Sequence, residues 1–350
     1  MSSAEHILSY AQTLRGGGVE RALLRLAGEW IALGRRVTLV IGSKEGPLAR
    51  ELPAGADVLL LDSPAYRALL SLPRHVRAVR PDVIFCPGSH YTGVAAWTRW
   101  RLGGATPPIV GKVSNALARP DHGAVTGLAH ALWLRQHPRF LDRVVAMTPA
   151  SAAETAAAMR LTPSSVPIIP NPPARPIAGA PQLNLPPRYV LGVGRLAPQK
   201  RWDQLVSAIA AMRERVPLVI LGEGEGRDAL MAQARTLGVD LILPGHVADP
   251  LPAMAGAALL ALTSDFEGSP GVLREALSMG APVVSTDSSP AVAEIIADPA
   301  WGAVVPREDP AALVAALDHW MVAPRPAPVT PPGSDSAARY LALFDSLMPA

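Results

Sequence analysis

The sequence predicts an α/β protein built from two doubly wound domains, each a parallel sheet with helices on both faces. Short β-branched runs alternate with stretches of helical periodicity along most of the chain, which is typical of βαβ units. The alternation is interrupted by 170-PNPPARPIAGAPQLNLPP-187, which is dense in proline and lacks periodicity. A length of 350 residues also exceeds what one hydrophobic core usually serves. We therefore expect two domains with a cleft between them.

The first domain is expected over residues 1–170. Its predicted strands are short apolar and β-branched runs at 6–11, 35–42, 57–61, 82–88, 108–114 and 143–149. A helix is predicted over 19–34, directly after the glycines 16-GGG-18. A second helix is predicted over 151–159, because Ser151 followed by Glu154 has the spacing of a capping box.

A linker is expected over 171–187 and a second domain over 188–322. The strands predicted there are 189–195, 217–224, 240–247, 258–264 and 281–286. The predicted helices are 203–215, 227–238 and one that is opened by 267-EGSPGVLRE-275. The remaining residues, 323–350, comprise a Pro-rich segment and a final helix over 336–348.

Composition narrows the class of protein. Apolar residues make up 49% of the chain and charged residues 17%, which is typical of a globular protein. The single cysteine excludes an intrachain disulfide framework and suits a reducing compartment. The start of the chain has no basic segment followed by an apolar one, and no run approaches the roughly 20 apolar residues of a membrane span. A cytoplasmic protein is therefore expected.

Charge is distributed unevenly along the chain. Residues 1–170 contain 19 Lys and Arg against 11 Asp and Glu, whereas residues 171–350 contain 13 against 18. The asymmetry suggests that the first half faces something anionic. Nucleic acid is not expected, because no zinc-ligand spacing, basic zipper or ribonucleoprotein motif is present. Trp97 and Trp100 beside Arg99 and Arg101 suggest an aromatic and basic patch at the inner face of a membrane; the alternative is an amphipathic helix with its tryptophans packed inward.

The segment 267-EGSPGVLRE-275 places two carboxylates around a predicted helix start. Ser269 is predicted as the N-cap and Pro270 as the first helical residue, so Glu267 falls in a loop and Glu275 in the second helical turn. The helix is expected to end near Met279, before Gly280. Free amides at a helix N-terminus bind phosphate, and carboxylates accept hydrogen bonds from sugar hydroxyls. The alternative is a capped surface helix with two solvated glutamates.

Two cations follow the first predicted strand of the second domain. Arg195 ends 189-YVLGVGR-195, and Lys200 lies five residues further on. At the carboxyl end of a parallel strand, both would face the same crevice as the helix start at 267–275. A pair of cations in that crevice can hold a pyrophosphate and neutralise charge on a leaving group.

Four sequence motifs follow one another between residues 189 and 310. They are GVGRLAPQKRWDQL, LGEGEGRDAL, LPGHVADP and LTSDFEGSPGVLREALSMGAPVVSTDSSPAVAEII. This order resembles the donor domain of the retaining GT-B glycosyltransferases with the E-x7-E signature, the glycosyl transferases group 1. The turn 16-GGG-18 resembles that family's glycine-rich loop, and the final helix resembles its C-terminal helix, which crosses back to the N-terminal domain. The resemblance implies the GT-B architecture, in which two Rossmann-like domains face each other across a cleft, with the acceptor bound by the first domain and the nucleotide sugar by the second.

The resemblance also implies roles for individual residues. Arg195 and Lys200 would bind the donor diphosphate and Glu267 the donor sugar, and these three would form the catalytic group. Glu275 would hold the ribose hydroxyls. Further substrate contacts would come from loop glycines, backbone amides and a base-pocket loop: Gly17, Gly18, Gly194, Gly245, His246, Val247, Ser269, Gly271 and Val272. Many relatives place a histidine where this chain has Asn115, so Asn115, His90 and His122 are candidates for contact with the acceptor.

The resemblance implies a retaining glycosyltransferase, and the absence of a metal-ligand pattern in the sequence predicts that it is independent of metal. It would move a sugar from a UDP- or GDP-linked donor to a saccharide or lipid-linked acceptor in envelope polysaccharide or glycolipid synthesis. No cofactor is expected, and no two aspartates lie two residues apart, so the D-x-D metal site of the other main glycosyltransferase architecture is missing. Two alternatives stay open: a nucleotide-sugar 2-epimerase of the same architecture, and a non-catalytic subunit that binds nucleotide sugar. Asn115 in the place of a histidine favours the second alternative.

Overall fold

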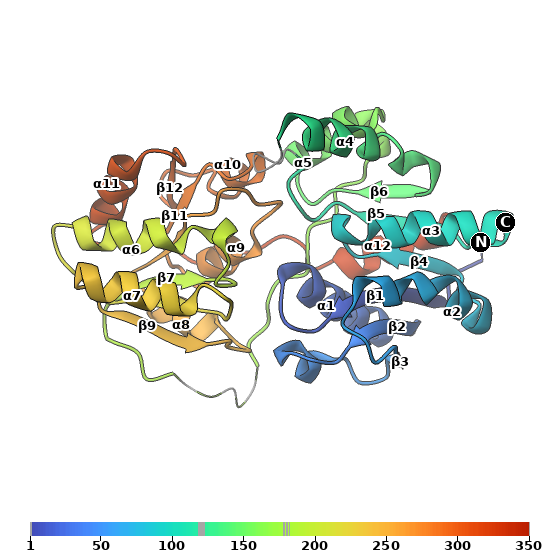
Figure 1. The fold of residues 1–350 in the computed structure, drawn as a ribbon, viewed down its shortest axis with the longest axis horizontal. Coiled ribbons are helices and arrows are strands. Elements are labelled where there is room, and N and C mark those ends of the chain that lie inside the picture. The colour runs from blue at the N-terminus through green and yellow to red at the C-terminus, as the bar shows by residue number, and fades with distance from the viewer. Residues whose placement is uncertain (1, 118–122, 178, 180, 182, 350) are drawn as a thin grey trace. The chain divides into compact units, whose positions relative to one another are not determined.

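The chain folds into two compact units, each built on its own parallel sheet (Figure 1). The computed structural model describes residues 2–117, 123–177, 179, 181 and 183–349. The first unit comprises Met1–Pro172 and Pro332–Ala350, and the second comprises Pro173–Pro331. The predicted fold class, α/β with doubly wound parallel sheets, is confirmed.

The first unit contains a six-stranded sheet of order β3-β2-β1-β4-β5-β6, in which all neighbouring strands are parallel. Its strands are β1 (His6–Thr13), β2 (Arg36–Ser43), β3 (Asp57–Leu60), β4 (Val83–Cys86), β5 (Ile109–Lys112) and β6 (Arg143–Val145). Its α-helices before the crossing to the second unit are α1 (Gly18–Ala32), α2 (Leu72–Val79), α3 (Thr92–Leu102), α4 (Ala124–Leu134) and α5 (Pro149–Met159).

Both faces of this sheet are covered by apolar side chains. Successive residues of a strand point to opposite faces, so Ile7 joins the core cluster under α1 while Leu8 joins the cluster on the other face. The last helix, α12 (Ser336–Asp345), belongs to the first unit and is drawn in red among its blue elements in Figure 1. Its Tyr340 and Phe344 are fully buried and meet the rings of Trp30 and Phe85 edge-on.

The second unit has a six-stranded parallel sheet of order β12-β11-β10-β7-β8-β9. The strands are β7 (Val190–Val193), β8 (Leu218–Leu221), β9 (Leu241–Gly245), β10 (Leu259–Leu262), β11 (Val283–Thr286) and β12 (Gly302–Val305). The helices are α6 (Trp202–Ala211), α7 (Arg227–Leu237), α8 (Leu251–Gly256), α9 (Gly271–Ser278), α10 (Pro290–Ile295) and α11 (Pro310–Trp320). The sequence patterns did not predict β12, whose residues GAVV include a glycine and an alanine.

Strand order reverses between β7 and β10 in the second unit, and between β1 and β4 in the first. From β7 the chain winds outward through β8 and β9, then returns to place β10 on the other side of β7. The loops that follow β7 and β10 therefore lie next to each other at the carboxyl ends of these strands. Such switch points are where doubly wound sheets bind ligands.

Two predicted helix starts are wrong. Helix α5 begins at Pro149, because Thr148 accepts a hydrogen bond from the Ser151 amide (3.1 Å) while the Ser151 hydroxyl accepts one from the Thr148 amide (2.9 Å). Thr148 is thus the N-cap, with proline at the first helical position. Helix α9 begins at Gly271 rather than Pro270, since Pro270 has an extended ψ of 101° and itself occupies the N-cap position predicted for Ser269. No described helix is long and apolar enough to cross a lipid bilayer.

Candidate active site

The two loops at the switch point of the second unit carry the predicted catalytic residues. Arg195 and Lys200 lie between β7 and α6, and Glu267 lies between β10 and α9. The topology therefore brings together residues that are 67 positions apart in the sequence. All of these residues belong to the second unit.

Lys200 and Glu267 are in direct contact. The Lys200 ammonium donates a hydrogen bond to Glu267 Oε1 at 2.5 Å, and the Ser264 hydroxyl donates to the same oxygen at 2.7 Å. The side chains of Lys200 and Glu267 are 15% and 12% exposed, so the pair is largely shielded from solvent but still reachable. A charge-assisted contact of this kind fixes both groups at the switch point.

Space for the lysine comes from Gly194. A Cβ atom at Gly194 would lie 3.1 Å from Cε of Lys200 and 3.3 Å from the Trp202 ring, which is tighter than most Cβ contacts. Arg195 is exposed, and its side chain makes no hydrogen bond or ion pair with any described residue, although its carbonyl accepts from the Trp202 indole at 2.9 Å. Arg195 thus presents an uncommitted guanidinium at the switch point.

The start of α9 offers backbone donors. Among the described residues, the amides of Ser269, Gly271 and Val272 donate to no protein acceptor, and Pro270 has no amide hydrogen. A Cβ atom at Gly271 would have no neighbour within 4 Å, so the backbone there is open to a ligand. Unpaired first-turn amides and the positive end of the helix dipole make this position suited to an anion.

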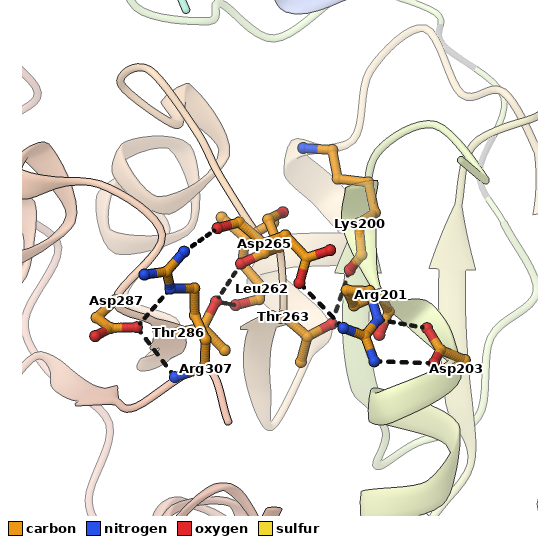
Figure 2. A network of polar contacts seen from close by, with 10 residues as sticks. Lys200, Arg201, Asp203, Leu262, Thr263, Asp265, Thr286, Asp287 and Arg307 are labelled. Atoms are coloured by element: carbon orange, nitrogen blue, oxygen red, sulfur yellow. Dashed lines mark hydrogen bonds and ion pairs between the residues drawn. The ribbon is translucent and has the colours of Figure 1, made fainter. Parts of the chain in front are cut away.

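The two loops are held together by a polar network that the sequence analysis did not identify (Figure 2). Arg201 has left-handed backbone angles (φ 48°, ψ 41°), and its guanidinium lies 3.1 Å from Asp265 Oδ1 and 3.3 Å from Asp203 Oδ1. The Thr263 hydroxyl lies 3.0 Å from the carbonyls of both Lys200 and Arg201. In Figure 2 the Lys200 side chain extends away from this network, and the network contacts Lys200 only through its backbone carbonyl.

A second set of contacts holds the Glu267 loop from the β11 and β12 side. Arg307 donates to the Asp265 carbonyl at 2.9 Å and to Asp287 Oδ1 at 3.2 Å (Figure 2). The Glu267 amide donates to the Ser288 carbonyl at 3.0 Å, and the Ser289 hydroxyl donates to the Gly268 carbonyl at 2.9 Å. Residues 263–268 are therefore held on one side by the loop that follows β7 and on the other side by the loops that follow β11 and β12.

The predicted base-pocket loop lies over the adjacent strands β8 and β9. Gly245 ends β9 with φ 93°, a left-handed backbone conformation that favours glycine. His246 and Val247 follow, both partly buried, and Val247 packs against the core. Glu275 lies in the second turn of α9 and is also partly buried. The loop Gly245–Val247 therefore lies at the carboxyl end of β9, at the same edge of the sheet as Lys200 and Glu267. Glu275 lies further along α9 than the first-turn amides.

The predicted residues of the first unit lie at its own switch point. Gly17 and Gly18 begin α1, and a Cβ atom at Gly17 would lie 2.5 Å from a Glu20 carboxylate oxygen. The Tyr91 hydroxyl donates to Glu20 at 2.7 Å, so Glu20 is held across the start of α1. At Gly88 a Cβ atom would lie 2.5 Å from the Ser114 hydroxyl and 2.8 Å from the side chain at the start of α1, so the loops after β1, β4 and β5 converge here.

The acceptor candidates sit on these same loops. Asn115 is three residues beyond β5, partly buried, and its side chain makes no hydrogen bond to a described residue. His90 is exposed; its Nε2 lies 3.4 Å from Gln12 Oε1, and its ring contacts Tyr66 and Tyr91 edge-on. His122 lies outside the described residues.

Lys112 is a buried cation that the sequence analysis did not single out. It ends β5, is 1% exposed, and donates to Asn171 Oδ1 at 3.0 Å. Burial lowers the pKa of this amine to about 8, and the nearby Glu20 carboxylate acts in the opposite direction. The sequence did contain a signal for this residue, namely a lysine inside the apolar run 109-IVGKV-113. A lysine is rarely fully buried without a partner, so such a position suggests a specific role. No group of three or more His, Cys, Asp or Glu side chains placed to hold a metal occurs among the residues that the structure describes.

Comparison with known proteins assigns both halves of the chain. Residues 17–172 match the family model described as "Glycosyl transferase 4-like domain", and residues 187–321 match "Glycosyl transferases group 1". Together with the two doubly wound parallel sheets, these matches correspond to the GT-B architecture, in which the first domain is similar to the glycosyl transferase 4-like domain and the second to the glycosyl transferases group 1 domain.

Curated relatives match part of their own length only. An N-acetylgalactosaminyltransferase of a diphospho-undecaprenol-linked saccharide from Campylobacter jejuni is 35% identical over 34% of this chain and 33% of its own. The GDP-mannose-dependent α-(1-6)-phosphatidylinositol monomannoside mannosyltransferase of Mycolicibacterium smegmatis is 34% identical over 39% and 41%. The matched region thus spans from a third to two fifths of these relatives.

Solved structures share the fold over nearly the whole chain. A point mutant of TarM from S. aureus, in complex with fondaparinux, α-GlcNAc-glycerol and UDP, aligns over 98% of this chain and 96% of its own, with a TM-score of 0.75 and 11% identity. Anabaena HepE in complex with UDP and glucose aligns over 98% and 97%, with a TM-score of 0.70 and 19% identity. At these identities the likeness establishes the fold alone.

Proposed function

We propose that this chain moves a sugar from a nucleotide-sugar donor to a saccharide or lipid-linked acceptor in lipopolysaccharide, envelope polysaccharide or glycolipid synthesis. The observation that carries the proposal is the contact of Lys200 with Glu267 beside the unpaired amides of α9, at a switch point of a parallel sheet. The acceptor class is supported by the Campylobacter and Mycolicibacterium relatives, whose names specify lipid-linked acceptors.

The donor diphosphate is proposed to bind at the start of α9. The amides of Ser269, Gly271 and Val272 would donate to its oxygens, and Lys200 and Arg195 would supply positive charge. As the bond from the anomeric carbon to the diphosphate oxygen breaks, its electron pair leaves with the diphosphate. These preorganised donors would stabilise that charge without a metal ion. The acceptor oxygen bonds to the anomeric carbon, and its proton passes to the leaving phosphate.

Glu267 is proposed to position the donor sugar rather than attack it. Its Oε1 already accepts hydrogen bonds from both Lys200 and Ser264, which reduces the nucleophilicity of that oxygen. The carboxylate can still accept a hydrogen bond from a sugar hydroxyl. Retention of the anomeric configuration rests on the resemblance to the E-x7-E family. Glu275 in the second turn of α9 would hold the ribose, and the loop at Gly245, His246 and Val247 would hold a uracil or guanine base.

The proposal is tested by a thermal-shift screen of UDP, GDP and their sugar conjugates on the full chain, followed by a transfer assay with the stabilising donor. A ligand that binds only the folded state at 100 times its Kd stabilises it by about 2.7 kcal/mol, which is readily seen. We expect one nucleotide series to raise the melting temperature and its sugar conjugate to be consumed only with acceptor. Epimerised sugar formed without acceptor would identify the 2-epimerase instead, and binding without turnover would identify a non-catalytic subunit.

Asp265 is expected to act as a positioning residue for this chemistry. Replacing it with alanine removes one of the two carboxylates that accept from the Arg201 guanidinium and loosens the turn that fixes Lys200, so we expect kcat to fall about tenfold while the donor KM changes little. Asp265→Asn keeps an oxygen at that position and should recover most of the rate. Asp240→Ala, at an exposed aspartate of the same unit, serves as the matched control. Unchanged kcat in Asp265→Ala, with normal melting, would contradict the role.

A further inference from the structure

The first unit presents a surface on which aromatic and basic side chains are intermixed. It is formed by the 3-10 turn Tyr66–Ser71 and helices α2 and α3, which contact one another. We define this aromatic–basic patch by six residues, namely Leu70, Arg74, Arg77, Trp97, Trp100 and Arg101. Trp100 is 70% exposed and Leu70 is 40% exposed, so two large apolar side chains stand in solvent within the patch.

Local contacts fix the geometry of the patch. The Arg101 guanidinium carbon lies 5.5 Å from the centre of the Trp97 ring and 5.8 Å from that of Trp100. The Trp97 indole donates to the Leu70 carbonyl at 2.9 Å, and Arg77 donates to the Arg101 carbonyl at 3.4 Å. Trp97 is therefore partly buried and anchored to the turn, whereas Trp100 is largely exposed, so the alternative of two tryptophans packed inward does not hold for Trp100.

The positive charge of the patch is not neutralised from within. Tyr66–Val79 and Thr92–Leu102 contain no aspartate or glutamate, and Arg74, Arg77 and Arg101 form no ion pair within the described part of the chain. Other arginines of the same unit do pair with carboxylates, as Arg36 does with Asp57 at 2.8 Å. An exposed tryptophan beside unpaired arginines is complementary to an anionic surface with an apolar layer beneath it.

Helix α4 is a second apolar surface of the first unit. Its residues Val125, Leu128 and Leu132 are 82%, 63% and 47% exposed, and Ala124–Leu134 contains no Asp, Glu, Lys or Arg. The helix meets α3 where the Trp133 indole donates to the Thr92 hydroxyl at 3.4 Å. Exposed aliphatic side chains gain nothing from phosphate or base edges, so they favour a bilayer over nucleic acid as the partner.

We propose that the aromatic–basic patch, with the exposed row of α4, docks on a bilayer that carries anionic phospholipids. The arginines would meet the headgroup phosphates, while Trp100 and the α4 side chains would enter the boundary between headgroups and acyl chains. The inference rests on the proposed function in one respect: such docking would hold the chain at the surface where a lipid-linked acceptor is found.

The test is co-sedimentation of the full chain with vesicles of phosphatidylcholine alone or with about 30% phosphatidylglycerol, at low and high salt. We expect salt-sensitive binding to the anionic vesicles only. Arg74→Ala with Arg77→Ala should weaken it by more than about tenfold, since each basic residue near an anionic surface contributes about fivefold. Trp100→Ser should weaken it at both salt concentrations. The matched controls are Arg213→Ala, at a 92% exposed arginine of the second unit, and Leu33→Ser, at a 52% exposed leucine of the first.

Equal binding by patch and control variants, or no preference for anionic vesicles, would overturn the proposal, as would binding to duplex DNA or self-association through the same residues. Melting curves verify that each variant is folded. Transfer to a water-soluble acceptor is measured in parallel. Lost vesicle binding with retained transfer supports the patch and leaves the proposed function intact. Vesicle binding without any transfer in the wild type contradicts the proposed function only.

Discussion

Replacing Lys200 with alanine is expected to lower the rate of sugar transfer by about 10²–10³-fold, the usual effect of losing one preorganised donor to a developing oxyanion. The Lys200 side chain is 15% exposed, its ammonium lies 2.5 Å from Glu267 Oε1, and the Thr263 hydroxyl donates to the Lys200 carbonyl. No other described lysine lies in the second unit, so no neighbouring amine can take over. The measurement is kcat and donor KM with the donor found by the thermal-shift screen.

Two variants control this result. Lys44→Ala removes an exposed lysine of the first unit and should leave transfer unchanged. Lys200→Arg keeps the charge but changes its shape, so a partial loss is expected because guanidinium and ammonium are not interchangeable at a fixed site. Transfer by Lys200→Ala within about threefold of wild type would remove Lys200 from the catalytic group. Melting temperatures distinguish loss of chemistry from loss of fold.

Much of the fold was predictable from the sequence because its signals are local. Buried parallel strands such as β7 and β10 are short apolar runs, and the helices between them have apolar residues at helical spacing. Boundaries were less predictable where two caps compete. Thr148, rather than Ser151, is the N-cap of α5, and proline follows it at the first helical position. Pro270 has an extended ψ and is therefore the N-cap of α9, which the sequence alone does not reveal. The assignment of α12 to the first unit depends on contacts with Trp30 and Phe85, which no local pattern encodes.

The candidate site was predicted in part for the same reason. Lys200, Glu267 and the start of α9 follow strand ends, and residues at the carboxyl ends of adjacent parallel strands meet. Arg201, Asp265 and Arg307 were missed because their roles arise from pairing between three different loops. An arginine with left-handed backbone angles also has no sequence signature comparable to that of a glycine. The direct contact of Lys200 with Glu267 was likewise not predicted, since both had been assigned to substrate.

Because of that contact, Glu267→Gln is expected to change sugar transfer and diphosphate binding in opposite directions. Glutamine keeps the size of the side chain but removes the negative charge that Lys200 and Ser264 share. Transfer should fall about 10- to 150-fold, equivalent to the roughly 1.5–3 kcal/mol of a charge-assisted hydrogen bond to the sugar. Binding of the free nucleoside diphosphate should instead become tighter by several-fold, because the Lys200 ammonium no longer has to leave a carboxylate to meet the phosphate.

Opposite effects on turnover and on product binding separate this role from general damage to the site. Isothermal titration with UDP or GDP measures the binding arm, and steady-state kinetics measures the transfer arm. Asp298→Asn, at an exposed acidic residue of the same unit, is the matched control and should alter neither. In the double variant with Lys200→Ala, the gain in diphosphate affinity should disappear, because it acts through the lysine. Weaker diphosphate binding by a folded Glu267→Gln protein would show that the carboxylate does not compete for Lys200.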